Sequence, residues 1–97
     1  MEKPEVDAIR LSPKDGVATV LRPVGRGECI RVGSGEAVSA LEALQDVPLC
    51  HKIALQAISP GDRIFKYGEP IGEATSAIRP GEHVHIHNLR SLRARAK

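Results

Sequence analysis

The hydrophobic positions of this chain repeat one spacing, aliphatic-x-x-Gly-x-x-aliphatic, in three separate segments. The segments are "VGRGECIRV" (24–32), "ISPGDRIFK" (58–66) and "IRPGEHVHI" (78–86). After each glycine, polar and apolar residues alternate, which is typical of a strand with one buried face. In the last two segments Pro precedes Gly, a pair that favours a type II turn. We therefore predict that each segment is a tight turn that begins a strand, anchored to the core by the aliphatic residue before the turn.

Four further segments carry the apolar alternation of strands, at residues 8–11, 16–24, 51–58 and 69–75. The second of these has broken periodicity, which a β-bulge would explain. Short strands separated by frequent turn residues are typical of a compact β domain.

The segment "SGEAVSALEALQDVP" has the spacing of a helix instead. Val38, Leu41 and Leu44 recur at i, i+3 and i+6, which places them on one helical face. Ser34 is a suitable N-cap residue, and Pro48 would stop the helix. The predicted fold is therefore mostly β, with many tight turns and one short helix.

Length and composition restrict the functions that this chain can have. Its 97 residues amount to one domain, a size more typical of a binding module or of one part of an enzyme than of a complete enzyme. Phe65 and Tyr67 are its only Phe, Trp or Tyr residues, so the core must be aliphatic and stacking on single-stranded nucleic acid is disfavoured. A net charge of +2, with acids and bases interspersed, is too weak for a general polyanion binder.

The cysteines and the N-terminal segment indicate the cellular compartment. Cys29 and Cys50 lie far apart in the sequence and form no C-x-x-C motif. The first residues are charged and lack the apolar core of a secretory signal, and no apolar run is long enough to span a membrane. We therefore expect a cytoplasmic protein with two reduced thiols.

Three of the four histidines, His83, His85 and His87, follow the last Pro-Gly turn. On an extended strand they would share one face, while Val84 and Ile86 would point to the other face and into the core. We expect residues 83–88 to be extended in this way.

Neutral imidazole is a common ligand of zinc, iron, copper and nickel. Two histidines at i and i+2 can bind one ion, but the first and the third lie about 13 Å apart on a straight strand, so a third ligand would need a bend. No carboxylate or cysteine stands at short ligand spacing. Metal ligation therefore remains open beside a solvated polar face and a face turned to a substrate or an interface.

Two other polar pairs are weaker candidates. His51 and Lys52 would begin a strand, where the simplest interpretation of His51 is a partly buried, hydrogen-bonded imidazole. Lys66 and Tyr67 lie in "FKYGE", where the tyrosine can pack while its hydroxyl reaches the surface. Asn88 follows the histidines and could orient a carboxylate or a hydroxyl through its amide.

Four motifs in the second half occur in an order that resembles a known family. The segments "HKIAL", "IFKYGEPIGEAT", "IRPGE" and "HVHIHNL" together are similar to the N-terminal domain of the altronate/galactarate dehydratase family, which belongs to the SAF group with a β-clip fold. The resemblance runs from about residue 8 to residue 89. It implies an SAF-like β-clip domain over 1–89, followed by a basic tail or linker over 90–97.

The resemblance implies a function in a lyase. Such enzymes are hydro-lyases that remove water from sugar acids such as altronate or galactarate, usually with a divalent metal such as iron, and sulfolactate sulfo-lyase is similar. This chain is then expected to be a small subunit or an N-terminal domain, inactive alone, whose active site is shared with a large catalytic subunit or domain. The implied substrate is a sugar acid or a sulfonated hydroxy acid; a homo-oligomer is compatible, and neither nucleic acid nor a membrane is an expected partner. The alternative is a non-catalytic SAF module that binds carbohydrate or protein.

Carried over by position, the resemblance also implies site residues. His85 and His87 are the expected catalytic residues and metal ligands. The expected substrate-binding residues are His51, Lys52, Lys66 and Asn88. The sequence departs from the family at Cys50, where a glycine commonly precedes the His-Lys pair, and the segment 25–50 matches least.

Overall fold

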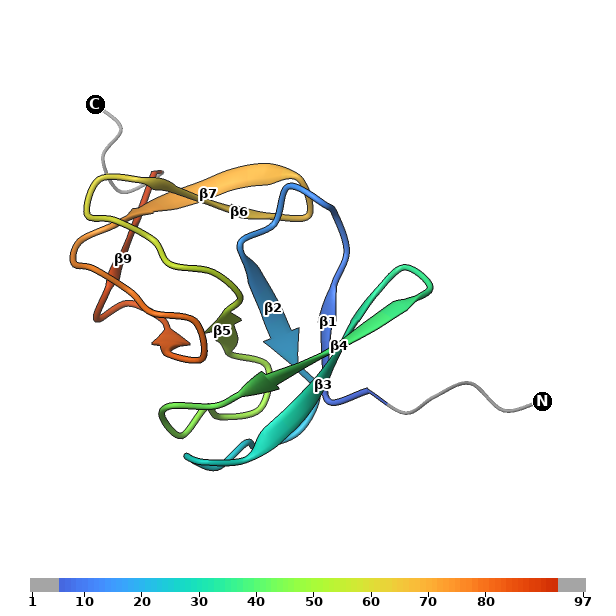
Figure 1. Ribbon diagram of the computed structural model, residues 1–97. Coiled ribbons are helices and arrows are strands. Elements are labelled where there is room, and N and C mark those ends of the chain that lie inside the picture. Colours follow the sequence, from blue (N-terminus) through green and yellow to red (C-terminus); the bar gives the residue numbers. More distant parts are fainter. Residues whose placement is uncertain (1–5, 93–97) are drawn as a thin grey trace.

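The computed structural model describes residues 6–92, and this part of the chain is built from strands and turns (Figure 1). Its strands are β1 (Ala8–Arg10), β2 (Val17–Val20), β3 (Cys29–Ser34), β4 (Ala37–Glu42), β5 (Lys52–Ala54), β6 (Arg63–Lys66), β7 (Glu69–Ala74), β8 (His83–Val84) and β9 (Leu89–Ser91). One sheet has the order β4-β3-β1-β2-β5-β8, and the other has the order β6-β7-β9. The expected mostly β domain with many tight turns is confirmed.

Strands β6 and β7 lie at one end of the domain and the hairpin of β3 and β4 at the other, and β2 and β5 of the six-stranded sheet lie between them (Figure 1). Strand β1 pairs in parallel with β3, and the other strand pairs are antiparallel. Among residues 6–92, no helix has the length and apolar character that crossing a membrane requires. Of the expected tail over 90–97, the first two residues belong to β9 and residues 93–97 lie outside the described part.

The three predicted turns form as expected. Gly27, Gly61 and Gly81 have φ near +90°, a value that glycine adopts readily, and each occupies the third position of its turn. In each turn the N–H of the fourth residue donates to the carbonyl of the first. The aliphatic residues before these turns, Val24, Ile58 and Ile78, are buried, so they anchor the turns as predicted.

The structure contains a fourth copy of this turn, which the sequence analysis missed. It spans Pro48 to His51, where the His51 N–H donates to the Pro48 carbonyl, and Cys50 takes the third position with φ 71°. Buried Val47 precedes it, so the aliphatic spacing is kept and only the glycine is exchanged for cysteine.

The four turns pair off in two equivalent arrangements. The N–H of the glycine or cysteine in each turn donates to the carbonyl of a buried residue, which lies eight positions before the last residue of the partner turn. The N–H of that buried residue donates back to the carbonyl of the fourth residue of the turn. The four exchanges are Gly27 and Glu28 with Ala43, Cys50 and His51 with Val20, Gly61 and Asp62 with Ala74, and Gly81 and Glu82 with Ala54. Bridges between Val24 and Val47 and between Ile58 and Ile78 complete the two pairs. The fold is thus two similar halves, each closed by a pair of turns.

An acidic side chain closes three of the turns from within. The carboxylates of Glu28, Asp62 and Glu82 accept a hydrogen bond from the backbone N–H of the first turn residue, at 2.8, 3.0 and 3.0 Å. In the fourth turn the first residue is Pro48, which has no N–H to satisfy. The last position of that turn is therefore free to carry His51.

Two aliphatic clusters form the core, and β2 and β5 separate them. In β5, Ile53 packs in the cluster of the first half and Ala54 in the cluster of the second half. In β2, Ala18 and Val17 divide in the same way. These two strands are buried on both faces. Strand β2 pairs without a register shift, so its burial on both faces, and not the expected β-bulge, explains the broken apolar alternation of residues 16–24.

The predicted helix over residues 34–47 is wrong. Strands β3 and β4 form a hairpin there, in register from Cys29↔Glu42 to Ser34↔Ala37. Gly35 has φ 62° at the tip, which favours a tight hairpin over a continuous helix. Val38 is 38% exposed, so the residues that gave the helical spacing do not form one buried face.

Candidate metal and substrate site

The histidines after the last Pro-Gly turn lie on a strand that is much shorter than predicted. Strand β8 contains only His83 and Val84, and the chain then turns back, with the N–H groups of Asn88 and Leu89 donating to the His85 carbonyl. Val84 is buried as expected, but Ile86 is 82% exposed. The prediction that residues 83–88 are extended is therefore wrong, because the turn carries Ile86 away from the core.

The buried side chain of Asn88 holds this turn closed. Its Oδ1 accepts the His85 N–H at 3.0 Å, and its Nδ2 donates to the His83 carbonyl at 2.9 Å. A further contact fixes the start of the turn, since the His83 N–H donates to Gln45 Oε1 at 2.9 Å. Asn88 thus sets the positions of two histidine backbones, and its contact with a substrate stays a prediction.

Strand pairing brings His51 to this turn from a distant part of the chain. Strands β5 and β8 pair with Ile53 opposite His83. As a result, His51 Nδ1 lies 2.8 Å from His83 Nε2, close enough for one ring to donate a hydrogen bond to the other. The His51 ring also stacks on the His85 ring, with centroids 3.9 Å apart. The prediction that His51 is partly buried and hydrogen-bonded is confirmed.

His51, His83 and His85 form a group of three potential metal ligands. One ring nitrogen from each lies within 4.8 Å of the other two. Nitrogens bound at 2.0–2.1 Å to one tetrahedral zinc ion are about 3.3 Å apart, so His51 and His83 could share an ion after a separation of about half an ångström that replaces their hydrogen bond. A metal lies in the plane of each imidazole that binds it, and therefore the stacked His85 ring must rotate to join. His85 is only half-buried, so that rotation is open to it.

The surroundings keep His83 and His85 in the neutral form that binds metals. Burial and then the charges of His87, His51, His85 and Lys52 lower the pKa of His83 to about 4. Burial, then His51 and Lys52, also lower the pKa of His85. Both rings are consequently neutral at pH 7, with a lone pair available for a cation.

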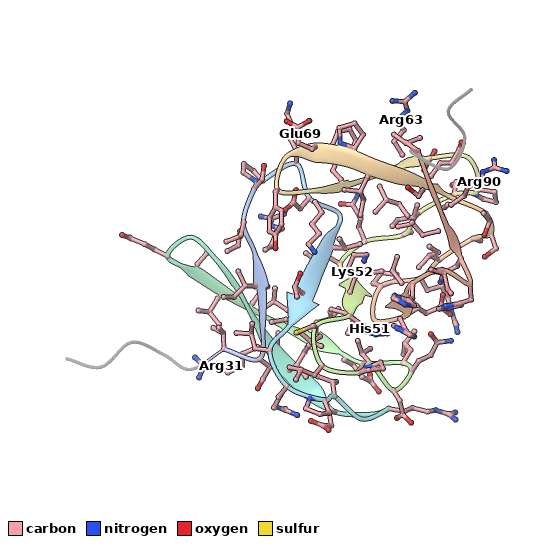
Figure 2. All side chains as sticks on the ribbon, turned by 180° about the vertical axis from the view of Figure 1, so that it is seen from behind. Arg31, His51, Lys52, Arg63, Glu69 and Arg90 are labelled. Carbon is pink, nitrogen blue, oxygen red and sulfur yellow. The ribbon has the colours of Figure 1, made fainter. Side chains whose placement is uncertain are left out.

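One lysine, Lys52, lies next to the histidines, and a second, Lys66, interacts with Lys52. Lys52 follows His51 on β5 and is half-buried; burial, and then the charge of Lys66, lower its pKa. The Lys66 ammonium lies 4.9 Å from the centre of the Tyr67 ring. Figure 2 shows His51 and Lys52 together near β5, whereas Arg63, Glu69 and Arg90 lie around the three-stranded sheet. The site therefore combines neutral imidazoles with one neighbouring cation, Lys52, and a second cation, Lys66, beyond it, a set that suits an anionic substrate.

The buried carboxylate of Asp15 fixes the turn that carries Tyr67, and the sequence analysis did not identify it. Its oxygens accept the N–H groups of Tyr67 and Gly68 at 2.9 and 2.8 Å, and Tyr67 has φ 58°. Asp15 thereby holds the β6–β7 hairpin against the β1–β2 connection and fixes the backbone that follows Lys66. The Asp-Gly pair at 15–16 signals a turn, but no local signal shows that its carboxylate reaches residues 67 and 68.

The other predicted residues lie around the histidine group. His87 is exposed and is not one of the three potential ligands among the described residues, although its ring lies 5.1 Å from that of His83. Cys50 and Cys29 are both free and exposed. The turn before the His-Lys pair is not reshaped by Cys50, because this residue adopts the left-handed conformation that glycine has in the other turns.

The paired turns and the two bent sheets define a small β-clip domain with a polar site on its surface. Comparison with known proteins agrees with this class: the chain belongs to the altronate/galactarate dehydratase SAF domain family, whose model matches residues 6–92. The resemblance noted from the motifs is confirmed.

Individual relatives fall into two groups by length. Altronate dehydratase of Bacillus subtilis (strain 168) is 39% identical over 83 residues, which are 86% of this chain and 16% of that protein. Galactarate dehydratase (L-threo-forming) of Escherichia coli (strain K12) is 32% identical over 83 residues, 15% of its length. The (2R)-sulfolactate sulfo-lyase subunit alpha of Paracoccus pantotrophus is 43% identical over 53 residues, 55% of this chain and 79% of that subunit. The chain thus spans about a sixth of the dehydratases that it matches.

Proposed function

We propose that this chain is the small subunit or the N-terminal domain of a sugar-acid hydro-lyase, similar to altronate and galactarate dehydratases, and that it is inactive alone. The observation that carries the proposal is that one ring nitrogen from each of three histidines lies within 4.8 Å of the other two, on a domain of this family. Two classes of relative support it, since the matched region is a small part of the dehydratases and most of a sulfo-lyase alpha subunit. The expected location is the cytoplasm.

In this proposal the histidine site faces an active site that is shared with a large catalytic subunit or domain. Dehydration next to a carboxylate needs a base that takes the α-proton and an acid or a metal that helps the hydroxyl to leave. Of the two expected catalytic residues, His87 is the proposed proton carrier, and His85 is proposed to act through the metal that it binds. His51, His83 and His85 would hold a divalent metal such as iron, which supplies a Lewis acid. Lys52 and Lys66 would bind the carboxylate or sulfonate of the substrate.

Reconstitution tests this proposal. The purified chain is mixed with a large dehydratase-like protein and assayed against aldonic, aldaric and sulfonated hydroxy acids. We expect no turnover by the chain alone and turnover by the mixture. Since general acid–base catalysis contributes about 100-fold or more, His87→Ala should lower kcat of the mixture by that factor while the two proteins still co-purify.

An exposed arginine on β6 offers a matched control. Arg63→Met removes a positive charge outside the histidine site and should leave kcat unchanged. Turnover by the chain alone would contradict the proposal. Binding to a carbohydrate or a protein without any effect on turnover would favour the non-catalytic SAF module instead.

A further inference from the structure

The potential ligands of the histidine site carry no negative charge. Among the described residues, the group within metal-binding distance consists of His51, His83 and His85, without a carboxylate or a thiol. The nearest acid in the sequence, Glu82, accepts the Arg79 N–H at 3.0 Å and pairs with the Arg79 guanidinium at 3.4 Å. Three imidazoles therefore leave the full charge of a divalent cation uncompensated.

The surroundings of the site are cationic as well. Lys52 acts electrostatically on both His83 and His85, and Lys66 acts on Lys52. No acidic side chain acts on either histidine in the described part of the chain. A divalent cation bound here is repelled by the Lys52 ammonium and, from further away, by that of Lys66, and this repulsion weakens its binding.

An anion bound at the site would compensate the charge of the metal and also reduce its repulsion by the lysines. Three protein ligands leave at least one coordination position open for another donor. A 2-hydroxy carboxylate brings a negative charge to the cation and to both lysines, and its carboxylate and hydroxyl oxygens can bind the same ion. Because binding free energies are reciprocal, an anion that strengthens metal binding is itself bound more tightly when the metal is present.

We propose that His51, His83 and His85 bind a divalent metal cooperatively with a 2-hydroxy carboxylate, and that Lys52 and Lys66 supply much of the coupling. This inference rests on the metal and substrate roles of the proposed function. It adds the energetic coupling of the two ligands: the chain alone binds a metal weakly, and an anionic substrate strengthens that binding.

Cobalt(II) is a suitable probe because its visible spectrum reports its ligands. The dissociation constant for Co²⁺ is measured on the full chain at buffered free Co²⁺, with and without glycolate, and the dissociation constant for glycolate is measured with and without Co²⁺. We expect each ligand to tighten the other by the same factor, about tenfold. Ethylene glycol has the same oxygen spacing without the charge and should have no effect.

Substitution of the lysines gives a prediction with two opposite signs. Without glycolate, Lys52→Met and Lys66→Met should bind Co²⁺ more tightly than the wild type, because a repulsive charge is removed. With glycolate, the enhancement should fall from about tenfold to about twofold or less. Misfolding of the site would weaken binding under both conditions, so this pattern separates a charge effect from damage.

Arg63→Met is the matched control. Arg63 lies on β6 three residues before Lys66, so the two side chains leave opposite faces of the strand, and Figure 2 shows Arg63 far from His51 and Lys52. This variant should keep the wild-type affinity and coupling. His51→Ala should abolish the glycolate-dependent Co²⁺ spectrum.

Two results would overturn the inference, and they have different consequences for the metal role in the proposed function. Equal Co²⁺ affinity with and without glycolate, together with loss of binding in His51→Ala, would refute the coupling and leave the metal role intact. Co²⁺ binding that is unaffected by His51→Ala would refute both the coupling and the metal role, while the reconstituted turnover would still decide whether the chain is part of a hydro-lyase.

Discussion

At the scale of single residues, Cys50 is the clearest departure from the repeated pattern of the sequence. It occupies a turn position that is glycine in the three other copies, and its φ of 71° is one that residues with a side chain adopt only at a cost. The aliphatic spacing around it, from Val47 to Ile53, was visible in the sequence. The repeated pattern includes glycine at this position, so it did not predict the fourth turn, although the aliphatic residues on either side keep their spacing.

Cys50→Gly should stabilise the protein. Relief of the left-handed strain is partly offset by the greater freedom of glycine in the unfolded chain, so we expect a gain of up to about 1 kcal/mol in the free energy of unfolding. Urea denaturation followed by circular dichroism measures it. Cys29→Gly is the control: this equally exposed cysteine lies inside β3, where glycine weakens a strand, and the variant should lose about 0.5–1 kcal/mol. Equal losses in both variants would contradict the strain argument.

At the scale of elements, local patterns predicted the turns and most of the strands but failed where an element has no single buried face. Strand β4 is exposed along nearly its whole length, so its side chains show neither the period of a strand nor that of a helix. The spacing of Val38, Leu41 and Leu44 was therefore coincidental. The histidine segment failed for a different reason, since Asn88 closes a turn through contacts that alternation of polar and apolar residues does not reveal.

The contact between β1 and β3 predicts a dependence of stability on pH. Asp7 Oδ2 accepts the Arg31 N–H at 2.8 Å, and this bond, together with the Arg22 guanidinium, holds the pKa of Asp7 below its ordinary value. A lowered carboxyl pKa contributes stability above the ordinary value near 4, and this contribution is lost as the pH falls through the lowered pKa. Asp7→Asn should therefore be less stable than the wild type by about 1 kcal/mol at pH 7.

Urea denaturation at pH 7 and at pH 3 tests this expectation. The difference between wild type and Asp7→Asn should narrow at pH 3, because below the ordinary pKa near 4 the unfolded wild-type chain binds a proton at Asp7 that the folded protein takes up only at lower pH. Glu36→Gln, at the exposed tip of the β3–β4 hairpin, should follow the wild type at both values. A constant difference between wild type and Asp7→Asn would show that the ionised form is not what stabilises the contact.

At the scale of the whole molecule, the sequence could not reveal which distant segments meet. His51 and His83 are separated by 32 positions and come together only through the pairing of β5 with β8. The resemblance to the family named both residues' motifs, but it did not give their distance. Asp15 likewise reaches a turn 52 positions away. Non-local contacts of this kind depend on the complete topology, which local patterns in the sequence do not reveal.

The shared strands β2 and β5 predict that both halves unfold together. Ile53 is fully buried in the first cluster and Ile64 is 1% exposed in the second. Truncation of a buried isoleucine to alanine costs about 2–5 kcal/mol. Ile53→Ala and Ile64→Ala should each lower the urea midpoint, and each should keep one transition.

Two probes with different coverage detect separate unfolding of the halves. Tyr67 is the single tyrosine of a chain without tryptophan, so its fluorescence reports on the hairpin of β6 and β7, whereas circular dichroism reports on all strands. Coincident curves are expected for Ile53→Ala. A circular dichroism transition that precedes the Tyr67 transition in this variant would show that the halves unfold independently.

The proline at the first position of the fourth turn has a consequence for protein engineering. At each of the other three turns, replacing the acid alone would leave the backbone N–H of the first turn residue without its acceptor. If that first residue were also exchanged for proline, no N–H would remain to be satisfied. A pair of exchanges such as Ser59→Pro with Asp62→His would thus graft an imidazole onto a corner that now has a purely architectural role. The four turns of this domain are thus equivalent positions for a side chain, and in the wild type one of them carries a histidine.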